Sequence, residues 1–287
     1  MELNNNLEYK RKSLAKKSVY EVILVISIII MLIPFIGILY LSIKPNAEIL
    51  AGDLSIPAAA EWGNYLKAFE TIDFGTMIKN TMIIALVTLT AEFVLGIMGS
   101  FAISRFKIGK GKLQRFFYTY FIVGLIIPVF LLIYPIYKMN FMLGTLDTLW
   151  AVILPYIGWS APMVTMLLVS AFNTIPASLE EAAVIDGCGT FKLLTRIDIP
   201  VIRSAIVTML IIQFLAIWNE FAVSVIMLTS PEVQTIALAS AKFVGIHTTD
   251  YGAMAAAVVL LSMPQVAVFS LFQKYVTGDL TAGSVKE

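Results

Sequence analysis

The sequence has little charge, one cysteine and one histidine. These are Cys188 and His247, in a chain of 287 residues. A single cysteine excludes an internal disulfide, and a zinc site needs three or four ligands, for which His and Cys are the usual choice. We therefore predict no disulfide and no metal site. The net charge of +1 at pH 7 lacks the basic excess that is typical of nucleic-acid-binding domains, so we expect no nucleic-acid partner.

The shortage of charge indicates a membrane protein. Charged residues make up 14% of the chain, against about 25% in soluble domains, and the mean hydropathy is +0.88. A spanning helix needs about 20 mostly apolar residues. The first such stretch follows a charged tail and lacks a small-residue cleavage site, which favours a retained helix over a signal peptide. We predict an all-α membrane protein with six transmembrane helices, at about 19–42, 80–103, 116–138, 149–172, 204–229 and 252–273.

The distribution of lysine and arginine predicts the orientation. Fifteen of the 20 basic residues precede the first span, lie between spans two and three or between spans four and five, or follow the sixth. Cytoplasmic loops carry the excess of Lys and Arg, so both termini are expected in the cytoplasm. The predicted domains are a basic N-terminal tail (1–18), a six-span domain (19–274) and a C-terminal tail (275–287).

The loop at 173–203 is unusually polar for this chain, with EEAAVIDGCGTFKLL at 180–194. Pro176 suits a first helical turn, and Ser178 with Glu181 has the spacing of a capping box. Gly187 provides a left-handed stop after a helix that ends near Asp186. A second short helix is expected from Thr190 to just before Pro200, which has no N–H to continue it.

One face of the first short helix predicts a contact with another surface. Leu179, Ala182, Ala183 and Asp186 recur at helical spacing, and the two alanines let another surface approach the backbone. Asp186 opposes the helix dipole, so Lys192 or Arg196 is expected to pair with it. A solvated connector is the plainer alternative. We favour a docking element, because a connector does not need thirty residues and two helices.

These motifs resemble the EAA loop of ATP-binding-cassette importer permeases. The similar residues are Glu181-Ala182-Ala183, Asp186-Gly187 and Ile199-Pro200, with Cys188 where the usual pattern has alanine. IWNEF at 217–221, TDYGAMAAAVVLLSMP at 249–264 and GDLTAGSVKE at 278–287 look like the carbohydrate-uptake branch, especially the maltose-transporter G-type subunit. The likeness implies a type I importer permease fold in a bacterial inner or plasma membrane. It implies ATPase-coupling roles for Glu181, Ala182, Ala183, Asp186, Gly187 and Pro200.

The resemblance also implies partners and an energy source outside this chain. GKGK at 109–112 lacks the GxxxxGK[ST] spacing that cradles phosphates, so ATP and Mg²⁺ are expected on a separate ATPase and no cofactor on this chain. The expected partners are a second, larger F-type permease, an ATPase dimer, an extracytoplasmic solute-binding protein and membrane lipid. The chain is predicted to be a transport subunit and not an enzyme, since HExxH and GxSxG are also absent.

Polar groups inside the spans are candidates for the substrate pathway. A charge at mid-bilayer costs about 2.5–3.5 kcal/mol, so it normally faces protein or water. For Glu92 and Glu220, the structural alternative is hydrogen bonding between helices or to the partner permease. An ion-coupled secondary transporter is the alternative function, although coupling-ion groups and internal repeats are not evident. The candidate pathway residues are Glu92, Gln213, Trp218, Asn219 and Glu220.

Overall fold

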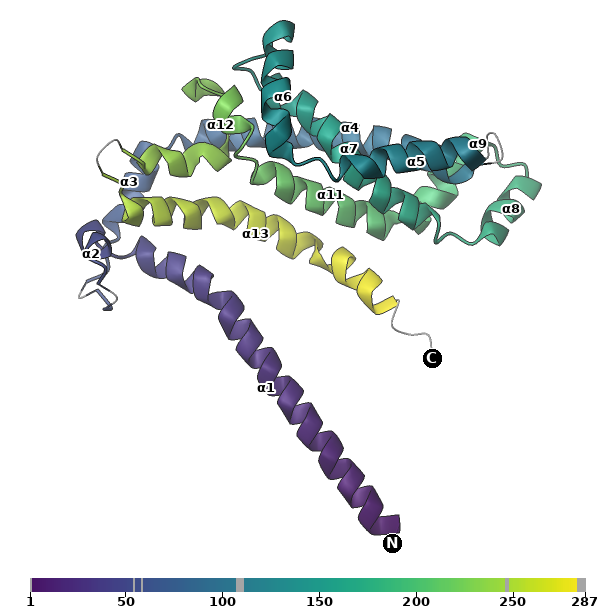
Figure 1. The fold of residues 1–287 in the computed structure, drawn as a ribbon, viewed down its shortest axis with the longest axis horizontal. Helices are drawn as coiled ribbons and strands as arrows, with labels where there is room; N and C mark the ends of the chain where they lie inside the picture. Colours follow the sequence, from purple (N-terminus) through teal and green to yellow (C-terminus); the bar gives the residue numbers. More distant parts are fainter. Residues whose placement is uncertain (1, 54, 58, 107–110, 246–247, 283–287) are drawn as a thin grey trace. The chain divides into compact units, whose positions relative to one another are not determined.

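The computed structural model describes residues 2–53, 55–57, 59–106, 111–245 and 248–282. His247, Lys107, Lys110 and the last five residues, on which some of the expectations above rest, lie outside them. The described chain is helical, with one isolated bridge between Val244 and Thr249. The helices are α1 (Glu2–Ser42), α2 (Asn46–Leu50), α3 (Gly63–Thr71), α4 (Phe74–Arg105), α5 (Lys112–Gly124), α6 (Val129–Leu143), α7 (Trp150–Phe172), α8 (Ala177–Ile185), α9 (Thr190–Leu193), η2 (Leu194–Asp198), α10 (Ile199–Val201), α11 (Arg203–Trp218), α12 (Ser224–Met227), η3 (Pro231–Val233), η4 (Ile236–Phe243) and α13 (Tyr251–Ala282) (Figure 1).

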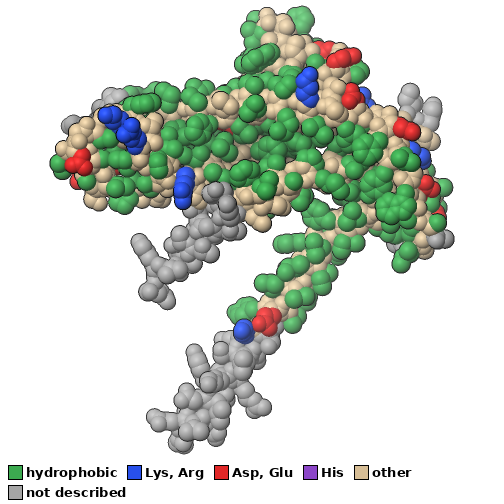
Figure 2. All heavy atoms as spheres, turned by 180° about the vertical axis from the view of Figure 1, so that it is seen from behind, with side chains coloured by type: hydrophobic (Ala, Val, Ile, Leu, Met, Phe, Trp, Pro, Cys, Tyr) green, Lys and Arg blue, Asp and Glu red, His purple; other side chains and the backbone are tan. Residues whose placement is uncertain are grey.

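Four of the described helices are long and apolar enough to cross a membrane: Val19–Ser42, Phe74–Arg105, Trp150–Phe172 and Tyr251–Gln273. The third predicted span is instead a pair of helices, and the fifth, α11, follows a bend after the second short helix of the loop at 173–203. α5 and α6 meet at 98°, and Thr190–Val201 meets α11 at 76°. The count is six if each bent pair is one span. Hydrophobic side chains cover most of the surface seen in Figure 2.

Two of the predicted spans differ from the structure, for identifiable reasons. Pro128 is the N-cap of α6; because proline lacks an N–H and restricts the residue before it, the chain turns there instead of running straight from 116 to 138. The fifth span was expected to reach residue 229, but α11 ends at Trp218. A separate four-residue helix, α12, follows after a turn.

The chain forms two compact units, of which the first comprises Met1–Thr71 and Phe243–Leu260. A short helix, α3, lies in this unit at Gly63–Thr71. Lys44 is fully buried, and its Nζ donates hydrogen bonds to Tyr40 Oη (2.6 Å) and to the Ser55 carbonyl (2.8 Å). Asn64 Nδ2 donates to the Lys44 carbonyl (2.9 Å). A buried ammonium is tolerated when polar groups replace its water, so Lys44 fixes the loop after α1.

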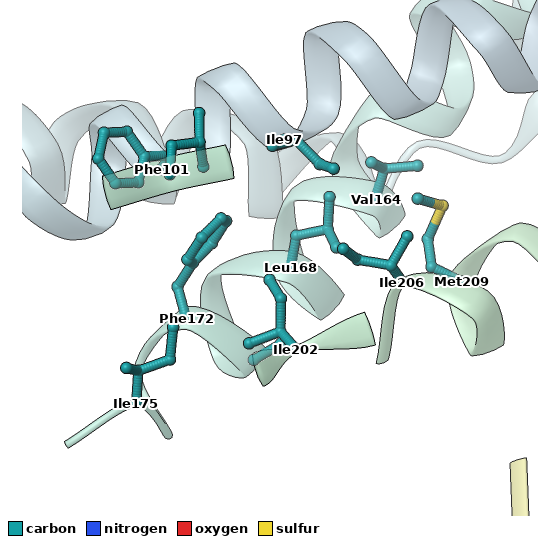
Figure 3. Packing of buried hydrophobic residues seen from close by; sticks show 11 residues of the cluster. Ile97, Phe101, Val164, Leu168, Phe172, Ile175, Ile202, Ile206 and Met209 are labelled. Carbon is teal, nitrogen blue, oxygen red and sulfur yellow. The ribbon is translucent and has the colours of Figure 1, made fainter. Parts of the chain in front are cut away.

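The second unit comprises Ile72–Lys242 and Leu261–Glu287, and its core lies between α4, α7 and α11. α4 packs along α7, and α11 contacts both. In Figure 1, α8 and α9 lie at one end of these three helices, while α6 and α12 lie at the other. Figure 3 shows the apolar cluster nearest α8, in which side chains of the three helices interdigitate with two residues of the connecting segments. The labelled residues are Ile97, Phe101, Val164, Leu168, Phe172, Ile175, Ile202, Ile206 and Met209.

Gly96 lies where α4 approaches α7 closely and gives a test of this packing. A Cβ at this position would lie 2.4 Å from Val164 Cγ1. Gly96→Ala is therefore expected to lower stability by about 1–3 kcal/mol, the usual effect of overpacking, measured by thermal unfolding of the detergent-purified protein. Gly99→Ala is the matched control, since a Cβ there would meet nothing within 4 Å. Equal loss in both variants would contradict the packing.

Candidate functional site

The segment from 173 to 203 folds as two short helices with a turn between them. Helix α8 ends with Asp186 as C-cap and Gly187 at φ 78°, as the sequence predicts. The Cys188 N–H donates to the Ala183 carbonyl (2.9 Å) and the Gly187 N–H donates to the Val184 carbonyl (3.0 Å). This pair of bonds is the Schellman motif, which glycine favours because it requires the left-handed conformation.

Two details of this segment differ from the expectation. The N-cap of α8 is Pro176, and no side chain caps the helix, so the Ser178–Glu181 capping box is wrong. The second helix begins at Thr190 as expected, but it continues through Pro200. A π-helical turn, η2, precedes Pro200; this widened turn changes the hydrogen-bond register, so the missing N–H does not end the helix.

The faces of α8 divide differently from the predicted stripe. Ala183 is buried at 8% exposure, whereas Ala182 and Asp186 are exposed. Within the segment at 173–203, the most exposed large apolar side chains are Ile185 (85%) on α8 and Phe191 (77%) on α9. Ala183 therefore packs against its own chain, and the free apolar surface of the segment is formed by the residues around Ile185. The predicted pairing of Asp186 with Lys192 or Arg196 does not occur among the described residues.

An open groove of about 750 Å³ lies between the end of α4 and α8. Its walls include Phe101 and Phe106 from the α4 side and Val184 and Ile185 from α8. Arg105, the last residue of α4, also lines the groove and binds Glu180. Sequence reasoning missed Arg105 as a site residue. The available signal was an arginine two residues after the second predicted span, at the start of a basic loop.

Two of the five pathway candidates bind each other. Gln213 Nε2 on α11 donates to Glu92 Oε1 on α4 at 3.4 Å, and both residues are buried. Glu92 also lines a pocket of about 290 Å³ with Gly96, Phe121 and Thr165. Glu92 Oε2 has no hydrogen-bond partner among the described residues. Glu92 thus joins α4 to α11 through one oxygen, and its carboxylate also interacts with Ser160 of α7.

The other three candidates lie at the end of α11. Trp218 is buried and its Nε1 donates to the Leu261 carbonyl (3.3 Å). Glu220 is 6% exposed and accepts three hydrogen bonds, from the N–H groups of Val223 (2.7 Å) and Ser224 (2.9 Å) and from Ser224 Oγ (2.6 Å). Both oxygens of Glu220 are therefore occupied by the start of α12. Asn219 is the exposed member of the set.

An aspartate ties the loop before α7 to the loop after α12. Asp147, at φ 58°, accepts hydrogen bonds from the backbone N–H groups of Thr229 and Ser230 (both 2.8 Å) and from the Ser230 hydroxyl. The hydrogen bonds from Ser230 and Thr229 lower the pKa of Asp147 to about 2. This tie keeps α12 and its turn in place next to the start of α7.

Metal chemistry has no evident site in the described part of the chain. No group of three or more His, Cys, Asp or Glu side chains gathers there. Two residues of the GKGK sequence are described: Gly111 is the N-cap of α5, and Lys112 is its first residue. What the geometry does offer is a helical bundle with buried polar groups and a two-helix segment at one end.

Comparisons with known proteins agree with this arrangement. The sequence profile of the family described as "Binding-protein-dependent transport system inner membrane component" matches residues 96–281. The trehalose/maltose transport system permease protein of Thermococcus litoralis is 32% identical over 96% of this chain and 99% of its own length. The diacetylchitobiose uptake system permease protein of Streptomyces coelicolor is 28% identical over 94% and 89%.

A solved structure shares the fold. A chain of a bacterial ABC transporter involved in the import of the acidic polysaccharide alginate superposes with a TM-score of 0.73, at 21% identity, and the match covers 90% of this chain and 95% of that chain. The family match spans more than half of the present sequence and includes α7, α8, α9 and α11. The chain belongs to the family of binding-protein-dependent transport system inner membrane components, the permease subunits of ABC transporters.

Proposed function

We propose that this chain is one permease half of an ATP-driven importer that carries a sugar, and that residues 173–203 couple it to a separate ATPase. The observation that carries the proposal is the exposed apolar surface on α8 and α9, where the described residues leave most of Ile185 and Phe191 uncovered. Exposed apolar side chains on a short, well-ended helix are typical of an interaction surface. The predicted coupling residues Glu181, Ala182 and Asp186 are exposed on the same segment.

The remaining predicted coupling residues have a structural part in this proposal. Gly187 ends α8, Ala183 seats it against its own chain, and Pro200 lies in the helical turn that leads into α11. The ATPase docks on α8, and the displacement of α8 passes through these contacts into the bundle. ATP and Mg²⁺ stay on the ATPase dimer in this account, because the chain carries no phosphate-binding motif.

The proposed topology has six spans with both termini in the cytoplasm, which places α8 on the cytoplasmic side. The excess of basic residues on that side supports this orientation. In the first span no residue of its most apolar part is buried within the chain. Membrane lipid and a second, larger F-type permease cover that surface in the assembled transporter. An extracytoplasmic solute-binding protein docks on the opposite side of the membrane.

A sugar is the proposed substrate class because two relatives are named for diacetylchitobiose and for trehalose and maltose, and the solved structure that shares the fold is named for the polysaccharide alginate. Sugars present hydroxyls and apolar ring faces, so an amide, a carboxylate and an aromatic ring are suitable groups to bind them. Asn219 is the candidate for direct contact, since it is exposed at the break between α11 and α12. Glu92 is the second, through its carboxylate in the 290 Å³ pocket.

Reconstitution tests the proposal. The chain is placed in liposomes with its partner permease, the ATPase and the solute-binding protein, and uptake of radiolabelled sugars is measured. We expect uptake that requires ATP on the side of the membrane where the ATPase lies. Uptake is also expected to stop when the binding protein is omitted. Uptake driven by a proton gradient, by this chain without the ATPase, would instead identify an ion-coupled carrier.

A further inference from the structure

One side chain joins the end of α4 to both α7 and α8. Arg105 Nε donates to Glu180 Oε1 on α8 (2.6 Å), and Arg105 Nη2 donates to the carbonyl of Phe172, the last residue of α7 (2.6 Å). The guanidinium holds both acceptors at once because its donors form a rigid planar fork. The side chains of Arg105 and Glu180 are only 18% and 15% exposed, so water screens this pair less than a surface pair.

The second acceptor strengthens the tie to α7. The last carbonyls of a helix lack partners within the helix, and its C-terminus carries partial negative charge. Arg105 meets that charge at Phe172, and its guanidinium carbon lies 6.0 Å from the centre of the Phe172 ring. The phenyl ring itself is part of the apolar cluster in Figure 3. Arg105 is therefore bound to Phe172 at the core of the second unit while it also binds Glu180 of α8.

A buried acid lies next to this pair. Asp198, at the end of η2, is fully buried, and no N–H of the described residues donates to either of its oxygens. Its carboxyl group interacts with that of Glu180, by charge and by hydrogen bonding, and electrostatically with Arg105. A buried carboxylate without donors is unfavourable. Two acids therefore lie beside one arginine, which binds only one of them here.

We propose that Arg105 is a positioning residue of the coupling segment, and that it exchanges Glu180 for Asp198 when α8 moves. The inference rests on the proposed function, in which the ATPase moves α8. With Glu180 bound, α4 is joined to α8; with Asp198 bound, α4 is joined to the segment that continues into α11. The exchange changes which helices move together and keeps the arginine paired in both states.

The test is Asp198→Asn in the complete reconstituted transporter. Asparagine keeps the size of the side chain but removes the charge that would receive Arg105. We expect unchanged ATPase co-purification and a drop of about tenfold in substrate transported per ATP. The reason is that the variant loses a hydrogen bond between charged groups in the second state, and the free energy of such a bond corresponds to about a tenfold change in an equilibrium constant. If Asp198 were only an unfavourable buried acid, the variant would raise the melting temperature and keep the full transport ratio, which would overturn the proposal.

Two further variants cover the case in which Asp198→Asn fails to assemble. Arg105→Lys keeps the charge and loses the fork, so it is expected to lower transport per ATP as well; a normal ratio would overturn the exchange. Glu180→Gln weakens the state seen here and is expected to raise ATP hydrolysis without the binding protein. Loss of ATPase association by the unmodified chain would contradict the proposed function itself, a different outcome from normal transport in Asp198→Asn.

Discussion

Ile185→Asp is expected to abolish ATP-driven uptake while leaving the chain in the membrane. Ile185 is 85% exposed, so the substitution disturbs little packing among the described residues. On the docked ATPase, however, it would bury a charge without a partner, at a loss of about 3 kcal/mol or more, which corresponds to at least about a 100-fold weaker association. The measurement is the amount of ATPase subunit that co-purifies with the permease from solubilised membranes.

Ile185→Leu is the matched control, because it keeps the apolar area and is expected to retain association and uptake. The variant Ala183→Asp is less informative, since Ala183 is buried and a charge there also disrupts the seat of α8. Gly187→Pro should likewise lose uptake, because proline cannot adopt the left-handed conformation at that position. Full ATPase association of Ile185→Asp would argue against this surface as the docking site.

Glu220→Ala is expected to destabilise the protein by about 2–5 kcal/mol and to stop transport. Its carboxylate accepts the two buried N–H groups that begin α12, and each buried donor left without an acceptor costs about 1–3 kcal/mol. The turn between α11 and α12 depends on these bonds. Thermal unfolding of the purified complex in detergent, followed by uptake at a permissive temperature, measures both effects.

Glu220→Gln separates capping from substrate contact. Glutamine retains one acceptor oxygen, so a capping role predicts a stability loss between those of the wild type and Glu220→Ala, with transport following stability. A substrate contact predicts that both variants lose transport equally at temperatures where both are folded. Normal stability with lost transport in Glu220→Gln would therefore restore Glu220 to the substrate pathway.

Much of the coupling segment could be predicted from sequence because its signals are local. Gly187 requires only its own left-handed conformation, and the Schellman bonds involve Ala183 to Cys188, all within six residues. Apolar length likewise predicted the four long apolar helices, since hydrogen bonding inside a bilayer leaves few other structures; it did not predict the bends in the other two spans.

The side-chain roles could not be predicted because they depend on distant contacts. Glu180 and Arg105 are 75 residues apart, and nothing near either one indicates that they meet. Helical spacing placed Ala183 on an interaction stripe, but spacing cannot tell which side the bundle covers. Similarly, the sequence stays mostly apolar after Trp218, so it does not indicate the turn at Glu220. The carboxylate oxygens of Glu220 meet their hydrogen-bond donors only after the chain has turned into α12.

Site-specific cross-linking at position 185 tests the central claim most directly. In a Cys188→Ser background, Ile185→Cys carries a short cysteine-reactive photo-cross-linker in membranes that contain the assembled transporter. The account predicts a cross-linked product between this chain and the ATPase subunit, with a yield that changes when ATP is added. Active transport with cross-links only to lipid or to the permease partner would contradict it.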